Sequence, residues 1–327
     1  MKKLITIASL LTALSLFSLP ASASVTLRFA HAAPESDLQQ DLAKHFKKEV
    51  ESRSNGEIIV NLFPQGQLGG DKQMIDGTRS GIVDISMVGI NNWSGLIPDG
   101  AAFELPYIFP TRESAYLALD GKPGQNVLKQ MEKYGAKGLG YPENGFRNIT
   151  NDKRPIKEPE DLKGLQMRVN NAKALNDMFK IMGASPQQIP VSELYTALES
   201  GVVDAQDHPI SITLSFKLFE VQDYLSLSQH AYSPLVIAMN LKKFNKLTPE
   251  QQKIITDVAK EAIDLQRAMS VQKEDEMITA LEKDGMKVNR DVNIQAFQTQ
   301  AKPVWKTFTD ENGDTIINEI LATQKQP

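Results

Sequence analysis

The chain has 327 residues, contains no cysteine and carries a formal net charge of −4. Without cysteine it has neither disulfides nor thiol chemistry, and a mildly acidic chain with no basic block is not expected to bind nucleic acid or anionic membranes. A chain of this length can bury large cores and usually divides into two domains.

Residues 1–23 are predicted to form a secretory signal peptide. Two lysines precede an apolar run over 4–19, and Ala-Ser-Ala at 21–23 has the small residues of a cleavage site. The run is too short, and too interrupted by Ser and Thr, to indicate a membrane span. We therefore expect export to the periplasm and a soluble mature chain that starts at Ser24.

The first part of the mature chain alternates between strand and helix patterns. Apolar residues recur at four-residue steps from Leu38 to Val50, which predicts an amphipathic helix. Strands are expected over 25–30, 58–63 and 82–88, with a second helix that ends at Gly81. This order implies a right-handed, largely parallel sheet covered by helices. Ligands then bind beyond the carboxyl ends of its strands.

The next part of the chain is predicted to contain a second α/β segment. A helix capped by Thr111 and a strand over 137–141 lead to a crossing between the segments near 141–145. The elements expected after it are a strand over 165–169, a helix over 172–182, an extended stretch over 187–190, a helix capped by Ser192 that ends at Ser200, and a strand over 202–206.

The last part contains a second crossing and a long helix. The apolar run over 224–240 is interpreted as two strands broken near Pro234. Thr248 and Pro249 start a helix of about 36 residues, long enough, at about 54 Å, to bridge two domains. The expected domains are 24–144 with 234–273, and 145–233 with 274–327.

Two arginines, Arg147 and Arg168, lie in apolar or amide-rich surroundings rather than in a solvated charge run. A guanidinium matches a carboxylate with two parallel hydrogen bonds, so two arginines in one short region suggest an anionic ligand. The alternative is that each arginine pairs with a nearby Asp or Glu of the protein.

Catalytic and metal-binding motifs are absent from the sequence. There is no G-x-S-x-G, no H-E-x-x-H and no cysteine nucleophile. Asp204, Asp207 and His208 could hold a metal, but neighbouring polar residues in a loop are more often solvated, so we expect neither a metal nor a cofactor. The glycines between Gly66 and Gly70 are interpreted as turn residues, because no phosphate-loop motif surrounds them.

Several stretches together resemble the DctP family, the periplasmic solute-binding subunits of TRAP transporters. They occur in the family's order over nearly the whole mature chain: LRFAHAAPESD, LFPQGQLGGDKQMIDGTRSGIVDISM, ELPYIF, NGFRNITN, LKGLQMRV and GASPQQIPVSELYTALESGVVDAQDHP. The resemblance implies a two-domain α/β clamp around a small organic acid, with a long bridging helix and no catalysis. It also implies TRAP membrane permease subunits as partners, and we expect a monomer.

The resemblance assigns ligand contacts to particular residues. The arginines of LKGLQMR and NGFR would hold the ligand carboxylate, and loops after the first and third strands and the residue before Pro209 would add contacts. The expected ligand-binding residues are Arg168, Arg147, His208, Asn92, Asn91, His31, Glu35 and Asn170.

The ligand that this pattern implies is a six-carbon sugar acid such as diketogulonate, an aldonate or a uronate. Sialate-binding relatives carry a carboxylate and an arginine where this chain has Gly89 and Asn92. NNWSGL, NGFRNITN and DHPI look more like the branch that binds 2,3-diketogulonate. One alternative is a periplasmic enzyme acting on sugar acids with His208 or His31 as general base. Another is a sensor that presents the closed protein to a receptor.

Overall fold

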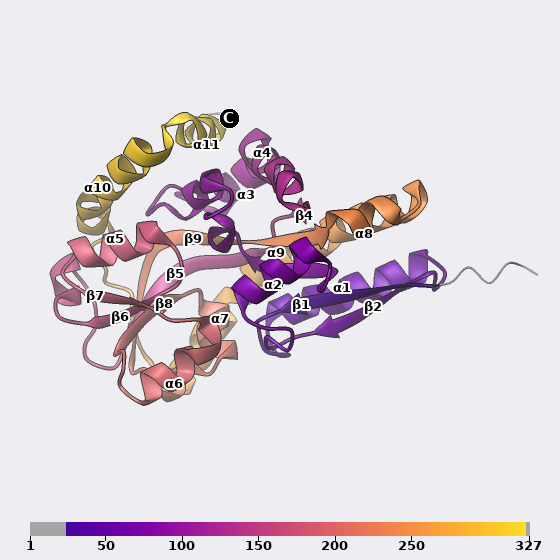
Figure 1. The fold of residues 1–327 in the computed structure, drawn as a ribbon. Helices are drawn as coiled ribbons and strands as arrows, with labels where there is room; N and C mark the ends of the chain where they lie inside the picture. Colours follow the sequence, from indigo (N-terminus) through magenta and orange to yellow (C-terminus); the bar gives the residue numbers. More distant parts are fainter. Residues whose placement is uncertain (1–23, 325–327) are drawn as a thin grey trace, which may run out of the picture.

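The structure is a computed structural model that describes residues 24–324. The predicted signal peptide lies outside these residues. The chain forms two α/β lobes that share one long strand and one long helix (Figure 1). Within residues 24–324, no helix is both long and apolar enough to cross a membrane.

The first lobe is built on a sheet in the order β2-β1-β3-β9-β4. Its own elements are β1 (Val25–His31), α1 (Leu38–Arg53), β2 (Ile58–Phe63), α2 (Asp71–Ser80), β3 (Ile85–Gly89) and β4 (Ala136–Gly140). As predicted, β1 pairs in parallel with β2 and β3. The apolar stripe of α1 faces this sheet, where the rings of Phe46 and Phe29 meet edge to face with centroids 5.4 Å apart.

One strand of this lobe begins later than predicted. The sequence predicts a strand over 82–88, but β3 begins at Ile85. Gly81 ends α2 in the left-handed region (φ 89°), and Val83 N then donates to Gly77 O. Residues 82–84 are therefore used by the turn that follows the helix.

Short helices connect β3 to β4. They are η1 (Ile90–Trp93), η2 (Pro98–Glu104), α3 (Arg112–Asp120), α4 (Lys122–Gln130) and η3 (Met131–Tyr134). The predicted cap at Thr111 is confirmed: Thr111 Oγ1 accepts from Ser114 N at 3.2 Å and Ser114 Oγ accepts from Thr111 N, which forms a capping box.

The second lobe contains the sheet order β9-β5-β8-β6-β7, with β10 also on β9. Its elements are β5 (Glu143–Asn151), η4 (Pro159–Leu162), β6 (Gln166–Val169), α5 (Lys173–Ile181), β7 (Ser185–Gln188), η5 (Val191–Glu193), α6 (Leu194–Glu199), β8 (Ala205–His208), α7 (Ile210–Ser215), η6 (Leu218–Glu220), β10 (Lys287–Asn289) and α10 (Ile294–Asn312). The predicted cap at Ser192 is wrong, because this residue lies inside η5 and α6 starts at Leu194 without a side-chain cap.

The run over 224–240 forms one strand, β9 (Tyr224–Asn240), so the predicted break at Pro234 is wrong. The partners of β9 nevertheless change there: Pro234 is opposite Glu143 of β5, and Leu235 is opposite Gly89 of β3. Proline has no N–H to donate to a neighbouring strand. Because it lies where β9 leaves one partner for another, the strand continues through it.

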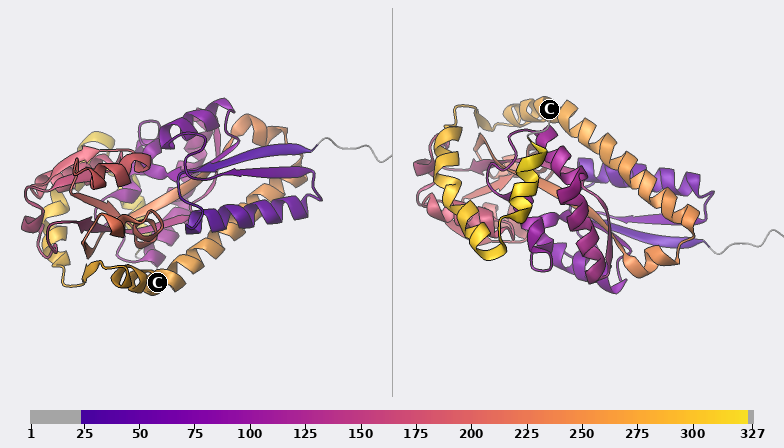
Figure 2. Two further views of the ribbon diagram at one scale, coloured as in Figure 1. Left: turned by 90° about the horizontal axis from the view of Figure 1, so that it is seen from below. Right: turned by 90° about the horizontal axis from the view of Figure 1, so that it is seen from above.

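The predicted long helix is confirmed as α9 (Pro249–Lys283), capped by Thr248. Its 35 residues correspond to about 52 Å. It follows α8 (Leu241–Lys246) and packs against α1 in the first lobe and α7 in the second. Figure 2 shows it running along one side of the molecule past both lobes.

The C-terminal helices divide between the lobes. α10 packs against α5 of the second lobe, whereas α11 (Thr315–Thr323) packs against α3 and α4. The expectation that residues 274–327 lie wholly with the second domain disagrees with this packing, because Ile316, Ile317 and Ile320 of α11 are buried in the core that also holds Ala115 and Leu119 of α3.

A buried carboxylate lies where the chain crosses between the lobes. Glu143, at the start of β5, is 1% exposed, and its Oε1 accepts from Arg112 Nε and from Ser270 Oγ, both at 2.8 Å. Its Oε2 accepts from the hydroxyl groups of Tyr116 and Tyr232. One side chain therefore connects β5, α3, β9 and the long helix α9.

The backbone of Glu143 is also held by α9. Gln266 Oε1 accepts from Glu143 N at 2.9 Å, and Gln266 Nε2 donates to Glu143 O at 2.7 Å. Arg112 is shared with a second acid of α9, since its Nη2 donates to Glu274 Oε1 at 2.6 Å. Hydrogen bonds therefore attach this crossing to the middle of α9, the helix that spans both lobes.

Glu143→Gln should lower the free energy of unfolding by about 3–5 kcal/mol, because it removes one partner of a buried ion pair. Urea unfolding of residues 24–327 measures the change. Asp257→Asn is the control: it breaks an exposed pair with Lys253 that should contribute less than about 1 kcal/mol. Equal effects of the two substitutions would refute a special role for Glu143.

Candidate functional site

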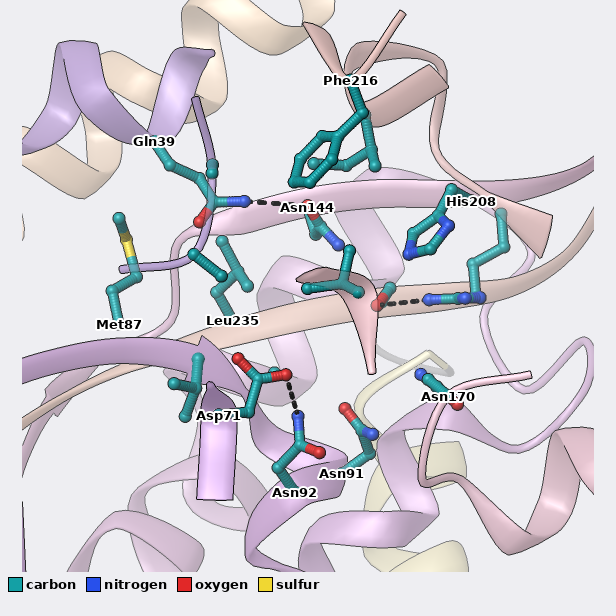
Figure 3. A pocket seen from close by; sticks show the side chains of 18 of the residues that line it. Gln39, Asp71, Met87, Asn91, Asn92, Asn144, Asn170, His208, Phe216 and Leu235 are labelled. Carbon is teal, nitrogen blue, oxygen red and sulfur yellow. Dashed lines mark hydrogen bonds between the residues drawn. The ribbon is translucent and has the colours of Figure 1, made fainter. Parts of the chain in front are cut away.

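A small cavity of about 70 Å³ lies between the two lobes. The first lobe contributes the loops after β1 and β3 and the start of α2, and the second lobe contributes β5, β6, β8 and α7. Figure 3 shows amide and carboxylate side chains of the first lobe facing His208 and Asn170 of the second. This is the position that the parallel strands of the first lobe predict for a ligand.

Six of the eight predicted binding residues line the cavity: Arg147, Arg168, His208, Asn91, Asn92 and Asn170. His31 and Glu35 do not. The His31 ring is buried, with Nε2 2.8 Å from Gln40 Oε1, and Glu35 is exposed on the outside of its loop. That loop instead presents Ala32 and Ala33 to the cavity, so these two predictions are corrected.

Most of the N–H groups of Arg147 donate to the protein, and chiefly to Asp207. Its Nε donates to Asp207 Oδ2 at 2.6 Å, and its Nη2 donates to Asp207 Oδ1 at 3.1 Å and to the backbone oxygen of Asp207. Its Nη1 donates to Ser233 Oγ at 3.2 Å. Of the five N–H groups of a guanidinium, four are used here. For Arg147, the structure thus shows the second of the two interpretations, in which the arginine pairs with an acid of the protein.

Asp207 also contacts a buried histidine. His230 Nε2 lies 3.0 Å from Asp207 Oδ2, and His230 Nδ1 lies 2.8 Å from Ser228 Oγ. Burial alone would raise the pKa of Asp207, but Arg147 and His230 outweigh it and hold that pKa well below its usual range. Burial lowers the pKa of His230, so a neutral ring donating from Nε2 fits this contact. Asp207 therefore serves the fold rather than a metal.

Arg168 has no such partner. It is 2% exposed, its Nε donates to Ile189 O at 2.9 Å, and its Nη1 is 3.3 Å from His208 Nε2. Among the described residues no carboxylate lies within ion-pair distance of it. Burial, reinforced by the charge of Arg147, lowers the pKa of Arg168 to about 10. An unpaired buried cation costs several kcal/mol, so this one is suited to receive an anion.

His208 supports Arg168 as a hydrogen-bond acceptor. Burial, with the charges of Arg168 and Arg147, keeps the pKa of His208 well below its usual value, so the ring is neutral. Its Nδ1 lies 2.5 Å from Gln206 Oε1, and Gln206 Nε2 donates to Thr150 Oγ1 at 2.8 Å. This chain places the His208 proton on Nδ1 and turns the Nε2 lone pair toward Arg168.

The rest of the cavity wall is rich in amides. Asn91 Nδ2 is buried and has no hydrogen-bond partner in the structure, and Asn92 Nδ2 donates to Asp71 Oδ2 at 3.1 Å. Gln39, Asn144 and Asp71 also line the cavity, and the sequence reading missed all three. Asp71 directly follows the turn glycines, where no motif distinguishes it from an ordinary first helical residue.

Two hydrogen bonds lie on the rim of the cleft, and one of them, between Ser215 and Asp37, joins the two lobes. Ser215 Oγ of α7 donates to Asp37 Oδ2 at 2.8 Å, and Gln39 Nε2 donates to Asn144 Oδ1 at 3.4 Å. Asp37 also caps α1, since its Oδ1 accepts from Gln39 N. Asp37 thus holds both the start of α1 in the first lobe and α7 in the second.

Within residues 24–324, no three His, Cys, Asp or Glu side chains are grouped to hold a metal ion. A family model described as bacterial extracellular solute-binding protein, family 7 (DctP), matches residues 29–312. The chain belongs to this family. The resemblance seen in the sequence is thus confirmed, as is the two-domain fold.

Relatives of known ligand agree with a solute-binding role. The 2,3-diketo-L-gulonate-binding periplasmic protein YiaO of Escherichia coli is 39% identical, over 90% of this chain and 89% of its own. A TRAP periplasmic solute-binding protein of a Polaromonas species, solved with D-erythronate, superposes with a TM-score of 0.90 at 33% identity, covering 93% of this chain and 100% of that one. The sugar acid binding protein DctPAm of Advenella mimigardefordensis, solved with galactonate, gives 0.89 and 31%, covering 92% and 98%.

DctP proteins bind solutes and do not catalyse reactions, so this chain is a solute-binding protein and not an enzyme. The enzyme alternative also lacks support in the site. His31 is outside the cavity, and the free nitrogen of His208 already faces the Arg168 guanidinium.

The two arginines should respond differently to substitution in the ligand-free protein. Arg147→Met leaves Asp207 buried and unpaired, and should lower the free energy of unfolding by about 3–5 kcal/mol. Arg168→Met removes an unpaired buried cation and should raise the free energy of unfolding rather than lower it. Urea unfolding of the two variants is the measurement, and similar losses in both would contradict the difference in pairing.

Proposed function

We propose that this protein captures a six-carbon sugar acid in the periplasm and delivers it to the membrane subunits of a TRAP transporter. Diketogulonate, aldonates and uronates are the candidate ligands. The observation that carries the proposal is Arg168, a buried guanidinium with no protein carboxylate beside it. The identities of the relatives' ligands, all sugar acids in the cases above, support it.

The ligand carboxylate would bind to Arg168. The two Nη groups can offer parallel N–H donors to its oxygens, since Nε is already used by Ile189 O. Arg147 would contribute at most one N–H, because the others are held by Asp207 and Ser233. The second arginine therefore positions the site more than it binds the ligand.

The ligand hydroxyl groups would be bound by the amides. A buried donor without a partner, such as Asn91 Nδ2, costs about 1–3 kcal/mol, which a ligand oxygen would recover. Asn92, Asn144, Asn170 and Gln39 add donors and acceptors around the same space. Phe216 and Leu235 provide an apolar surface for the C–H groups of the sugar chain.

Binding would be coupled to closure of the two lobes. We propose that bending occurs where the chain crosses between them, near 141–145 and near 232–235, while α9 remains attached to both. Residues 24–144 and 234–273 would move as one body, with α11 added to it because of its packing on α3 and α4. Residues 145–233 and 274–312 would form the other body. The protein would act as a monomer.

The affinity for the sugar acid should depend strongly on Arg168. Once thermal-shift screening of C4 to C6 sugar acids has identified the best ligand, Arg168→Ala should weaken its binding by about 2–5 kcal/mol. Arg168→Lys keeps the charge but loses the two-pronged geometry, and should fall between Ala and wild type. Calorimetric titration measures each affinity. An Arg168→Ala protein that binds like wild type would rule out the carboxylate assignment.

Closure should be visible in solution and should depend on the rim contact. Small-angle scattering should show a smaller radius of gyration with saturating ligand than without it. Ser215→Ala removes the hydrogen bond to Asp37 and should weaken binding by about 0.5–1.5 kcal/mol, mainly through faster ligand release. Ser200→Ala, on an exposed helix end, is the matched control. A radius unchanged by ligand would contradict the closure.

A further inference from the structure

We propose that Asp71 restricts this site to ligands with a single carboxylate, so that the part of the ligand near α2 must be uncharged and hydroxylated. This inference rests on the proposed function and adds a rule about which sugar acids are accepted. It concerns the first-lobe wall of the cavity, whereas Arg168 belongs to the second lobe.

The carboxylate of Asp71 faces the cavity and does not cap the helix that it begins. Asp71 is the first residue of α2, and the helix is preceded by Gly70 with no side-chain cap. Its carboxylate accepts one hydrogen bond from the described part of the chain, from Asn92 Nδ2 to Oδ2 at 3.1 Å. In Figure 3 a dashed line joins its carboxylate to Asn92. No cation of the described chain forms an ion pair with it.

The charges on the cavity wall leave room for one anion only. The charged side chains that line the cavity are Arg147, Arg168 and Asp71. Arg147 is neutralised by Asp207, so one positive group and one negative group remain. A ligand carboxylate on Arg168 satisfies the positive group. A second carboxylate would have no cation to bind and would lie near Asp71, where like charges in a dry site repel strongly.

Asp71 also favours hydroxyl groups directly. An ionised carboxylate only accepts hydrogen bonds, and bonds from hydroxyl donors to it are short and strong. Oδ1 of Asp71 accepts none from the described chain, so it is open to a ligand hydroxyl. Burial raises the pKa of Asp71 above its usual value, and Arg168 and Asn92 offset only part of the rise. The same side chain therefore attracts a hydroxylated tail and repels a charged one.

Aldonates and aldarates of the same configuration test this, because they differ only by a CH₂OH or a COO⁻ group at the far end. Galactonate with galactarate, and gluconate with glucarate, are the probes, measured by calorimetric titration at pH 7.5. Wild type should bind the better monoacid at least about 100-fold more tightly than its diacid. Asp71→Asn keeps the shape of the side chain and should reduce that ratio at least about tenfold.

The control is Asp76→Asn, on the exposed face of the same helix, where the carboxylate pairs with Lys72. It should leave the ratio unchanged. Equal binding of monoacid and diacid by wild type, or a ratio that Asp71→Asn does not change, would overturn this inference while leaving the proposed function standing. Failure of every sugar acid of the thermal-shift screen to bind, these four included, would overturn both.

Discussion

The ion pair between Arg147 and Asp207 decides what the rest of the site can do. Asp207 lies on β8, the strand between the two strands that carry the arginines, Arg147 on β5 and Arg168 on β6. Both oxygens of this carboxylate and its backbone carbonyl accept hydrogen bonds from Arg147, whereas Arg168 contacts Ile189 O and His208. Arg168 is left charged, buried and unpaired. The fold bears that cost, and only an external anion removes it.

Strand geometry explains how two such different environments arise on neighbouring strands of one sheet. Successive side chains of a strand point to opposite faces. Along β8, Asp207 meets Arg147 and His230, while Gln206 and His208 contact each other and His208 meets Arg168. A shift of β8 by one residue would exchange these roles, because register assigns every side chain to a face. The network from Thr150 through Gln206 to His208 fixes the histidine as an acceptor for the binding arginine.

The features that the sequence predicted well are those set by neighbouring residues. The caps at Thr111 and Thr248, the four-residue spacing of α1 and the uninterrupted α9 all depend on contacts within a few positions. The break predicted at Pro234 failed because the effect of a proline depends on which strands lie beside it, and β9 changes partner there. The site residues His31 and Glu35 failed for a similar reason: a loop's sequence does not say which side chains face inward. The difference between Arg147 and Arg168, and the place of Asp71 in the cavity, follow from strand adjacency and from the approach of two lobes.

The same unpaired charge bears on the proposed closure. A direct contact between the two bodies across the rim is the hydrogen bond of Ser215 with Asp37, which contributes about 1 kcal/mol. Closing the empty protein would bury Arg168 at a cost of several kcal/mol, which exceeds what that contact returns. A bound carboxylate turns this cost into a favourable interaction, and the first-lobe amides reach the ligand only when the lobes meet. A ligand shifts an equilibrium only by its difference in affinity for the two states, and here that difference is concentrated at one guanidinium. Without ligand, the cost of burying Arg168 opposes closure. With ligand, the pairing of Arg168 with the ligand carboxylate favours closure.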